Sequence, residues 1–352
     1  MTRVRVRDDL RALEGYHSPQ VSVRVRLNTN EAPTAPPEAF RDAYAAELSR
    51  IDWHRYPDRG ATQLRADIAA FHEVDAAQVF VANGSNEVLQ TLLLTYAGTG
   101  RTVATFEPTY QLHAHIARIT GATVLEAQRA ADFTLDPAEV DRALAAEPVV
   151  TFLCSPNNPT GMVETERTVR DLLARAPGLL VVDEAYGQFA PWSALSLVDE
   201  DRPLVVTRTY SKTWSMAAAR LGYLIGPSWL VAELDKVVLP YHLDAAKQIA
   251  GRLALRFGGE MNDRVDAIVA ERDRVAAALA AMPVHVWPSG ANFILFRPNA
   301  PAGNDVWQGL VERDVLVRNC SSWPRLDDCL RVTIGTRDED DVFLAALQEV
   351  LA

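Results

Sequence analysis

The sequence has 352 residues, of which 48% are hydrophobic and 23% are charged. This composition is typical of a globular protein, and the length is sufficient for one large α/β domain and a smaller one. The net charge is −11 at pH 7, so we expect no nucleic-acid partner, although local basic pockets for anionic ligands are compatible with it.

The three cysteines, Cys154, Cys320 and Cys329, are too few and too scattered for a disulfide framework or a zinc site. They fit a reducing compartment, and we expect a cytoplasmic protein without a bound metal. The first ten residues contain arginine but no apolar core, so they do not resemble a secretory signal. No apolar run approaches the roughly 20 residues of a membrane-spanning helix, so we expect no membrane contact.

The first forty residues are irregular and include Pro33, Pro36 and Pro37, which predicts an extended arm. Short apolar runs then alternate with helical segments. This alternation predicts an α/β fold with a mainly parallel sheet sandwiched by helices. The predicted strands are 79–81, 102–106, 149–153, 179–182 and 204–206.

The pattern changes after about Asp244. Long helical segments over 248–282 come first, and a closing helix begins at Glu339. Strand-like segments lie between them, at 292–296, 315–318 and 330–334. We therefore expect three parts, namely an N-terminal arm (1–45) that packs with a small α+β domain (245–352), and a large domain (46–244).

Each predicted strand of the large domain ends in polar or special residues. These ends are Gly84-Ser85-Asn86, Pro108-Thr109-Tyr110, 157–161 (NNPTG), 183–186 (DEAY) and 209–212 (TYSK). Because ligands bind at the carboxyl ends of strands in an open α/β sheet, the five ends should meet at one crevice.

Three of these residues can carry chemistry. Lys212 follows a buried strand, where burial and a nearby cation would lower its pKa and let the amine attack an aldehyde; the alternative is a surface lysine. Asp183 ends a buried strand and needs a partner, such as a protonated ring nitrogen, a helix N-terminus or an ion pair. Tyr186 can donate to an oxygen on the same ring or can be a core tyrosine.

The segment Gly84-Ser85-Asn86 precedes a predicted helix over 87–96. Glycine, a hydroxyl and free backbone N–H groups at a helix start form a phosphate-binding site, although an ordinary helix cap satisfies the same pattern. Arg220 can add a cation to such a site.

Together these motifs resemble the fold-type I pyridoxal-phosphate aminotransferases, and among them the histidinol-phosphate aminotransferases. The similar segments span nearly the whole chain. They are 16–20 (YHSPQ), 26–33 (RLNTNEAP), 55–58 (RYPD), 83–87 (NGSNE), 155–161 (SPNNPTG), 183–186, 209–212, 220–223 (RLGY) and 330–337 (LRVTIGTR). The resemblance implies transamination of histidinol phosphate with 2-oxoglutarate in histidine biosynthesis.

The resemblance also implies roles for residues around pyridoxal phosphate. Lys212 would hold the cofactor as a Schiff base and move a proton between the substrate carbon and the cofactor. Asp183 would pair with the pyridinium nitrogen, Asn158 and Tyr186 would bind the ring hydroxyl, and Tyr110 would stack on the ring. The cofactor phosphate would be held by Gly84, Ser85, Asn86, Thr209, Ser211 and Arg220.

For the substrate, the resemblance implies that Arg331 binds the carboxylate, a task suited to a bidentate guanidinium. Tyr16, Asn158 and Arg337 are further substrate-binding candidates, and Arg318 is another cation near the last strands. Tyr56 would reach the phosphate of the neighbouring subunit, which implies a homodimer with shared active sites.

The chain departs from many relatives in the arm, where Ala32-Pro33-Thr34 replaces an Asn-Pro pair followed by an aromatic residue. Two other activities on the same scaffold therefore stay open, an aromatic amino acid aminotransferase and a phosphothreonine decarboxylase. A transcription regulator with an aminotransferase-like domain is disfavoured by the acidic net charge. We expect His54, His113 and His115 to be packing or surface residues.

Overall fold

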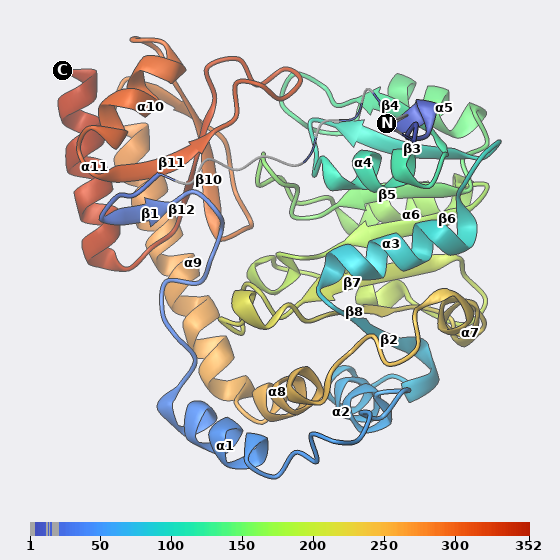
Figure 1. Ribbon diagram of the computed structural model, residues 1–352. Coiled ribbons are helices and arrows are strands. Elements are labelled where there is room, and N and C mark those ends of the chain that lie inside the picture. The colour runs from blue at the N-terminus through green and yellow to red at the C-terminus, as the bar shows by residue number, and fades with distance from the viewer. Residues whose placement is uncertain (1–3, 12, 14, 16–20) are drawn as a thin grey trace.

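The computed structural model describes residues 4–11, 13, 15 and 21–352, which form an α/β fold with two sheets (Figure 1). The larger sheet has seven strands in the order β2-β8-β7-β6-β5-β3-β4. Its strands are β2 (Val79–Ala82), β3 (Thr102–Glu107), β4 (Thr123–Gln128), β5 (Val150–Cys154), β6 (Leu179–Asp183), β7 (Leu204–Thr209) and β8 (Gly222–Ile225). The strand β8 runs opposite to the other six strands, which are parallel to one another. The sheet is therefore mainly parallel, as predicted.

Helices cover both faces of the seven-stranded sheet. One face packs against α3 (Ser85–Tyr96), α4 (Leu112–Ile119) and α7 (Ser228–Val237), and the other against α5 (Pro137–Ala145) and α6 (Glu166–Arg175). Successive residues of a strand point to opposite faces. Val181 and Val182 accordingly enter different hydrophobic clusters. Burial on both sides explains why these strands are continuous apolar runs in the sequence.

The smaller sheet has five strands in the order β1-β11-β12-β10-β9. They are β1 (Val25–Leu27), β9 (Val284–Val286), β10 (Phe293–Pro298), β11 (Val315–Asn319) and β12 (Leu330–Thr333). The helices α9 (Gly258–Ala280), α10 (Gly303–Val311) and α11 (Arg337–Leu351) pack against it. Since β1 pairs with β11 in parallel, the N-terminal arm supplies a strand to a sheet otherwise built from the C-terminal part.

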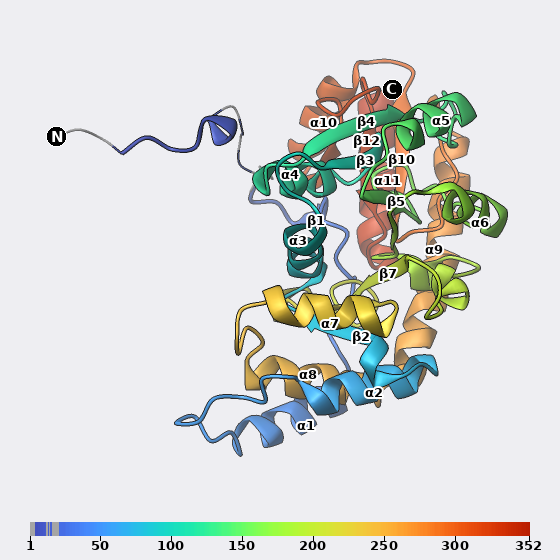
Figure 2. The same ribbon diagram turned by 90° about the vertical axis from the view of Figure 1, so that its right-hand side faces the viewer.

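The remaining helices lie beside the larger sheet. The helix α8 (Ala245–Leu255) contacts both α1 (Glu38–Leu48) and α2 (Thr62–His72), and the three lie below the sheets in Figure 1. Five short 3-10 helices complete the described elements: η1 (Asp8–Leu10), η2 (Ala76–Gln78), η3 (Gly187–Phe189), η4 (Ala194–Leu197) and η5 (Ala217–Ala219). In Figure 2, η1 lies apart from the two sheets and the helices that cover them. The expected division near residue 244 stays a prediction.

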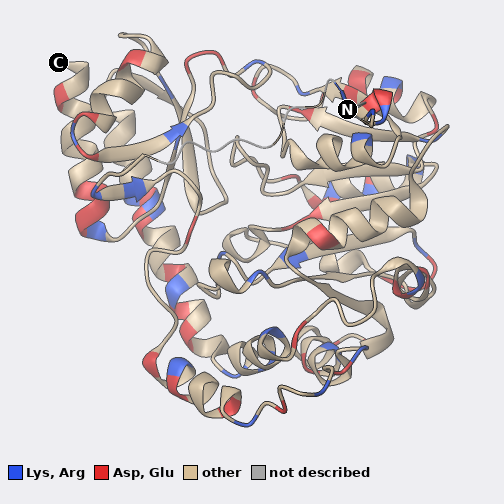
Figure 3. Ribbon diagram, in the orientation of Figure 1, with Lys and Arg blue, Asp and Glu red and all other residues tan. Residues whose placement is uncertain are grey.

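Charged residues lie mostly on the helices and connecting segments, and the central strands are largely uncharged (Figure 3). Within the described ranges, no helix combines the length and the apolar character needed to cross a membrane. Over the same residues, no group of histidine, cysteine, aspartate and glutamate side chains is arranged to hold a metal ion.

Candidate active site

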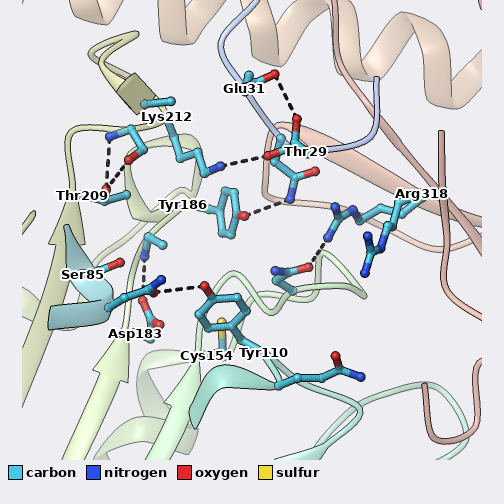
Figure 4. A pocket seen from close by; sticks show the side chains of 18 of the residues that line it. Thr29, Glu31, Ser85, Tyr110, Cys154, Asp183, Tyr186, Thr209, Lys212 and Arg318 are labelled. Carbon is cyan, nitrogen blue, oxygen red and sulfur yellow. Dashed lines mark hydrogen bonds between the residues drawn. The ribbon is translucent and has the colours of Figure 1, made fainter. Parts of the chain in front are cut away.

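The five predicted strand ends meet at one cavity, which has a volume of about 440 Å³ (Figure 4). It lies between the two sheets. The strand ends of the larger sheet contribute Ser85, Asn86, Tyr110, Asn158, Asp183, Tyr186, Thr209, Ser211 and Lys212 to its lining. The opposite side is formed by residues 28–31 of the arm and by Arg318, Trp323 and Arg331.

Lys212 follows β7 and enters the cavity from the larger sheet. Its Nζ donates a hydrogen bond to the backbone oxygen of Thr29, 3.1 Å away. Burial lowers the pKa of Lys212 to about 7, and the positive charge of Arg331 acts in the same direction, while Glu31 opposes it. A substantial fraction of the amine is therefore neutral near pH 7, as a nucleophile toward a carbonyl must be.

Asp183 ends β6 and is 1% exposed. Its Oδ1 accepts hydrogen bonds from Thr207 Oγ1 (3.0 Å) and from the backbone nitrogen of Ala185 (3.1 Å), and its Oδ2 lies 2.8 Å from His113 Nε2. His113 also stacks on Phe152, with ring centroids 4.5 Å apart. The sequence analysis predicts a packing or surface histidine, and no pattern in the sequence indicates that it also contacts a carboxylate of the cavity.

Tyr186 lies beside Lys212 and is joined to the arm. Asn30 Nδ2 donates to its hydroxyl oxygen over 2.9 Å, and the backbone nitrogen of Asn30 donates to Thr333 Oγ1 over the same distance. Burial raises the pKa of Tyr186 to about 12, against the opposing effect of Arg331. The phenol therefore keeps its proton at neutral pH and can act as a hydrogen-bond donor.

A group of cationic and hydroxyl residues surrounds the start of α3. Gly84 precedes this helix with a φ of +79°, and a Cβ there would lie 2.8 Å from Arg220 Nη2. Glycine therefore permits both the turn and the close approach of the guanidinium group. Arg220 Nη1 donates to Ser211 Oγ (3.2 Å), and Thr209 Oγ1 bonds to the same oxygen (3.0 Å). The first N–H groups of a helix have no partner within it, so this end of the cavity is suited to an anion.

Two arginines face the cavity from the smaller sheet. Arg318 of β11 and Arg331 of β12 are partners in the antiparallel register, so their side chains lie on the same face. Arg331 is 5% exposed and donates to Asn158 Oδ1 and to the backbone oxygen of Asn28. Its Nε has no hydrogen-bond partner within the described part of the chain. Such a buried donor has capacity for a ligand.

Two predicted residues lie elsewhere, and a third is not among the described residues. Arg337 is the exposed first residue of α11 and is not part of the cavity lining, where Arg318 is found instead. Tyr56 is 80% exposed and stacks on Tyr241, with centroids 4.5 Å apart, away from this chain's own cavity. Tyr16 lies outside the described residues.

Other lining residues were not predicted from the sequence. They are Asn28, Thr29, Asn30, Glu31, Gln111, Cys154, Ala185, Ala217, Ala218 and Trp323. Cys154 ends β5, so its position at a strand end was the available signal; burial raises the pKa of its thiol, which stays protonated. Trp323 lies on the connection between β11 and β12, where nothing in the local sequence indicates a cavity.

The cavity brings together an amine of lowered pKa, a buried carboxylate, a protonated phenol and cationic groups, a combination suited to a pyridoxal-phosphate enzyme such as an aminotransferase. The chain belongs to the aminotransferase class I and II family, whose model matches residues 23–347.

Individual relatives agree with this family. The chain is 43% identical to a histidinol-phosphate aminotransferase of Mycobacterium avium, with 99% of this chain and 89% of the relative covered. It is 44% identical to a histidinol-phosphate aminotransferase of Frankia casuarinae, with 98% and 90% covered. The structure of the histidinol-phosphate aminotransferase of Sinorhizobium meliloti in complex with pyridoxal-5'-phosphate superposes with a TM-score of 0.84 at 22% identity, covering 94% of this chain and 91% of that one. This last likeness shows the fold.

Proposed function

We propose that this aminotransferase transfers the amino group of histidinol phosphate to 2-oxoglutarate, with pyridoxal phosphate bound at Lys212. The observation that carries the proposal is the cross-strand pair of Arg318 and Arg331 facing the cavity. Like charges directly opposite each other in a sheet are destabilising, so an anion between them is favoured. Histidinol phosphate offers a phosphate, and glutamate, the product from 2-oxoglutarate, offers carboxylates. Guanidinium groups bind both kinds of anion.

The cavity fits pyridoxal phosphate at each of its functional groups. Lys212 can bind the aldehyde carbon, and the Asp183 carboxylate can pair with the protonated ring nitrogen. Tyr186 and Asn158 can bind the ring hydroxyl, and Tyr110 can cover one ring face. Hydroxyl groups, backbone N–H groups and a guanidinium are available to the phosphate, from Gly84, Ser85, Asn86, Thr209, Ser211 and Arg220. When bound, the cofactor supplies a carbonyl carbon for the amino group and a ring that accepts electrons.

The side chains of this protein then have distinct tasks. Lys212 Nζ holds the cofactor and moves the proton at the amino-bearing carbon of the substrate, a task that its pKa of about 7 supports. Asp183 keeps the ring nitrogen protonated, and His113 and Thr207 fix the orientation of its carboxylate. Arg331 binds the anionic group of each substrate and so orients the reacting carbon.

We further propose a homodimer in which Tyr56 reaches the cofactor phosphate of the partner subunit. Large apolar side chains gather near this residue on the surface of the single chain: Trp53 is 79% exposed, Leu239 is 74% exposed, and Tyr241 stacks on Tyr56. An isologous interface would cover such residues. We expect the dimer to function in the cytoplasm.

A panel of amino donors tested with 2-oxoglutarate examines the substrate. We expect a higher kcat/KM for histidinol phosphate than for phenylalanine or tyrosine. If an aromatic amino acid is turned over faster under matched conditions, the aromatic aminotransferase activity replaces the proposal. Borohydride reduction followed by peptide mapping tests the cofactor: the label should lie on Lys212, and a label on any other peptide contradicts the assignment.

A further inference from the structure

Trp323 forms a wall of the active-site cavity that the roles given above leave unused. It lies on the connection from β11 to β12, after Arg318, and lines the cavity while being only 7% exposed.

The connection that carries Trp323 is held by its own backbone. The backbone nitrogen of Trp323 donates to the backbone oxygen of Cys320 (2.9 Å). The backbone nitrogen of Leu326 donates to the backbone oxygen of Trp323 (3.2 Å). The loop is closed at its base, where the Cys320 nitrogen donates to the oxygen of Cys329 (2.9 Å). These bonds give the loop a defined conformation.

Trp323 belongs to a hydrophobic cluster with Phe133, Leu295, Cys320, Leu326 and Cys329. The loop is also attached to the larger sheet, because Arg325 Nη1 donates to the backbone oxygen of Arg129. Trp323 therefore belongs both to this cluster and to the lining of the cavity.

The other aromatic residues that line the described part of the cavity are engaged on the cofactor side. Tyr110 donates a hydrogen bond to Asn86 Oδ1 (3.1 Å), and Tyr186 accepts one from Asn30. The arm contributes polar residues, 28–31, to the lining. Of the aromatic residues that line the described part of the cavity, Trp323 is therefore the one that follows Arg318 and remains available to a substrate.

We propose that Trp323 determines donor specificity, by packing its indole against a planar side chain of the amino donor while the arginines bind the donor's anionic group. The expectation that the amino donor carries a phosphate rests on the proposed function. The expectation that the enzyme prefers a donor with a ring does not. Aromatic rings gain from stacked or edge contacts beyond the area that they bury. A donor without a ring fills the same space with fewer contacts and is discriminated against.

Two pairs of donors with and without a ring test the proposal in the holoenzyme. Histidinol phosphate is paired with 2-aminopropyl phosphate, and phenylalanine with alanine, and kcat/KM is measured in the first half-reaction from the cofactor absorbance. In Trp323→Leu we expect the preference for the ring-bearing member to fall about tenfold, mainly through a higher KM, with the ringless donor nearly unchanged. Trp323→Phe should retain most of the preference.

Phe133→Leu is the matched control, since Phe133 belongs to the same cluster but does not line the cavity. It should leave the preference intact. An equal loss for both members of each pair in Trp323→Leu, or an equal change of preference in Phe133→Leu, overturns the proposal. If the wild-type enzyme does not use histidinol phosphate, the proposed function fails, and the phenylalanine and alanine pair still decides the role of Trp323.

Discussion

His113 Nε2 lies 2.8 Å from Asp183 Oδ2, and neither side chain is more than 2% exposed. The histidine comes from α4 and the aspartate from the end of β6, so the contact joins a helix on one face of the sheet to the cavity. His113→Phe preserves the stacking on Phe152 but removes this bond.

We expect kcat of His113→Phe to fall roughly tenfold to a hundredfold, because a hydrogen bond to a charged group is lost and the carboxylate is less well oriented. The KM for the donor should change little. Steady-state kinetics check this. His115→Phe, on the same helix and only partly buried, is the control and should behave as the wild type. Equal effects of the two substitutions would count against an orienting role of His113.

Asp183→Asn should damage turnover far more than folding. The amide oxygen can still accept the hydrogen bonds from Thr207 and Ala185, so the packing around it is kept. The neutral amide cannot hold a proton on a ring nitrogen, and we expect kcat to fall by roughly a hundredfold or more. Thermal unfolding and kcat are measured on the same preparation. Near wild-type turnover would exclude the proposed role of the carboxylate.

The lowered pKa of Lys212 has a consequence for stability in the cofactor-free protein. In the unfolded chain the lysine titrates near 10.5 and in the folded chain near 7. Between these pH values the unfolded chain binds a proton that the folded chain does not, so the free energy of unfolding rises with pH. The rise should be present in the wild type and absent in Lys212→Met.

Urea unfolding of the cofactor-free protein from about pH 7 to about pH 9 measures this difference. Lys236→Met is the control, since the Lys236 side chain is 66% exposed and pairs with Glu233. Its pH profile should follow that of the wild type. Parallel profiles for the wild type and Lys212→Met would contradict a lowered pKa at Lys212.

Tyr56→Ala and Lys212→Ala subunits, each inactive alone, should regain activity when mixed. In a heterodimer with one substitution in each chain, both defects fall in one site if Tyr56 serves the partner, and the other site is intact. Activity per heterodimer should then approach half that of the wild-type dimer. Heterodimers that form without regaining activity would show that Tyr56 does not complete the neighbouring site.

Arg331→Ala should lower kcat/KM roughly tenfold to over a hundredfold for both histidinol phosphate and glutamate, because charge-assisted bonds to either anion are lost. Arg337→Ala is the comparison. Arg337 is exposed at the start of α11 and is not part of the cavity lining, so its removal should change little. A larger loss in Arg337→Ala than in Arg331→Ala would contradict the assignment of the anion site.

The strands that were predicted from the sequence are those buried on both faces, such as β6, where every residue is buried. The strands β4 and β8 of the larger sheet were missed, as were the three-residue strands β1 and β9 of the smaller sheet. β4 lies at the sheet edge and is mostly partly exposed, so its apolar pattern is interrupted. β8 has only four residues and begins with Gly222, which resembles a turn in the sequence.

The same distinction holds for the cavity. Residues such as Asp183 and Lys212 were predictable because they lie at or just after the carboxyl ends of strands in one sheet, where ligands bind. A strand end can be recognised from the neighbouring residues in the sequence. His113 and Trp323 were not, because their importance depends on which distant segments fold against them. His113 matters because it contacts Asp183, which belongs to another element. Trp323 matters because the two sheets face each other and bring it into the cavity lining.

The pairing of β1 with β11 means that residues 25–27 cannot reach their final partners until residues 315–317 have been synthesised. Asn30 bonds to Thr333, which is 303 residues away in sequence, and the same asparagine bonds to Tyr186, which lies beside Lys212. The larger sheet can form while the final strands are still being synthesised. The side of the cavity that β11 and β12 contribute cannot form at that stage. A nascent chain released before Thr333 would therefore have its lysine in position and its substrate site open.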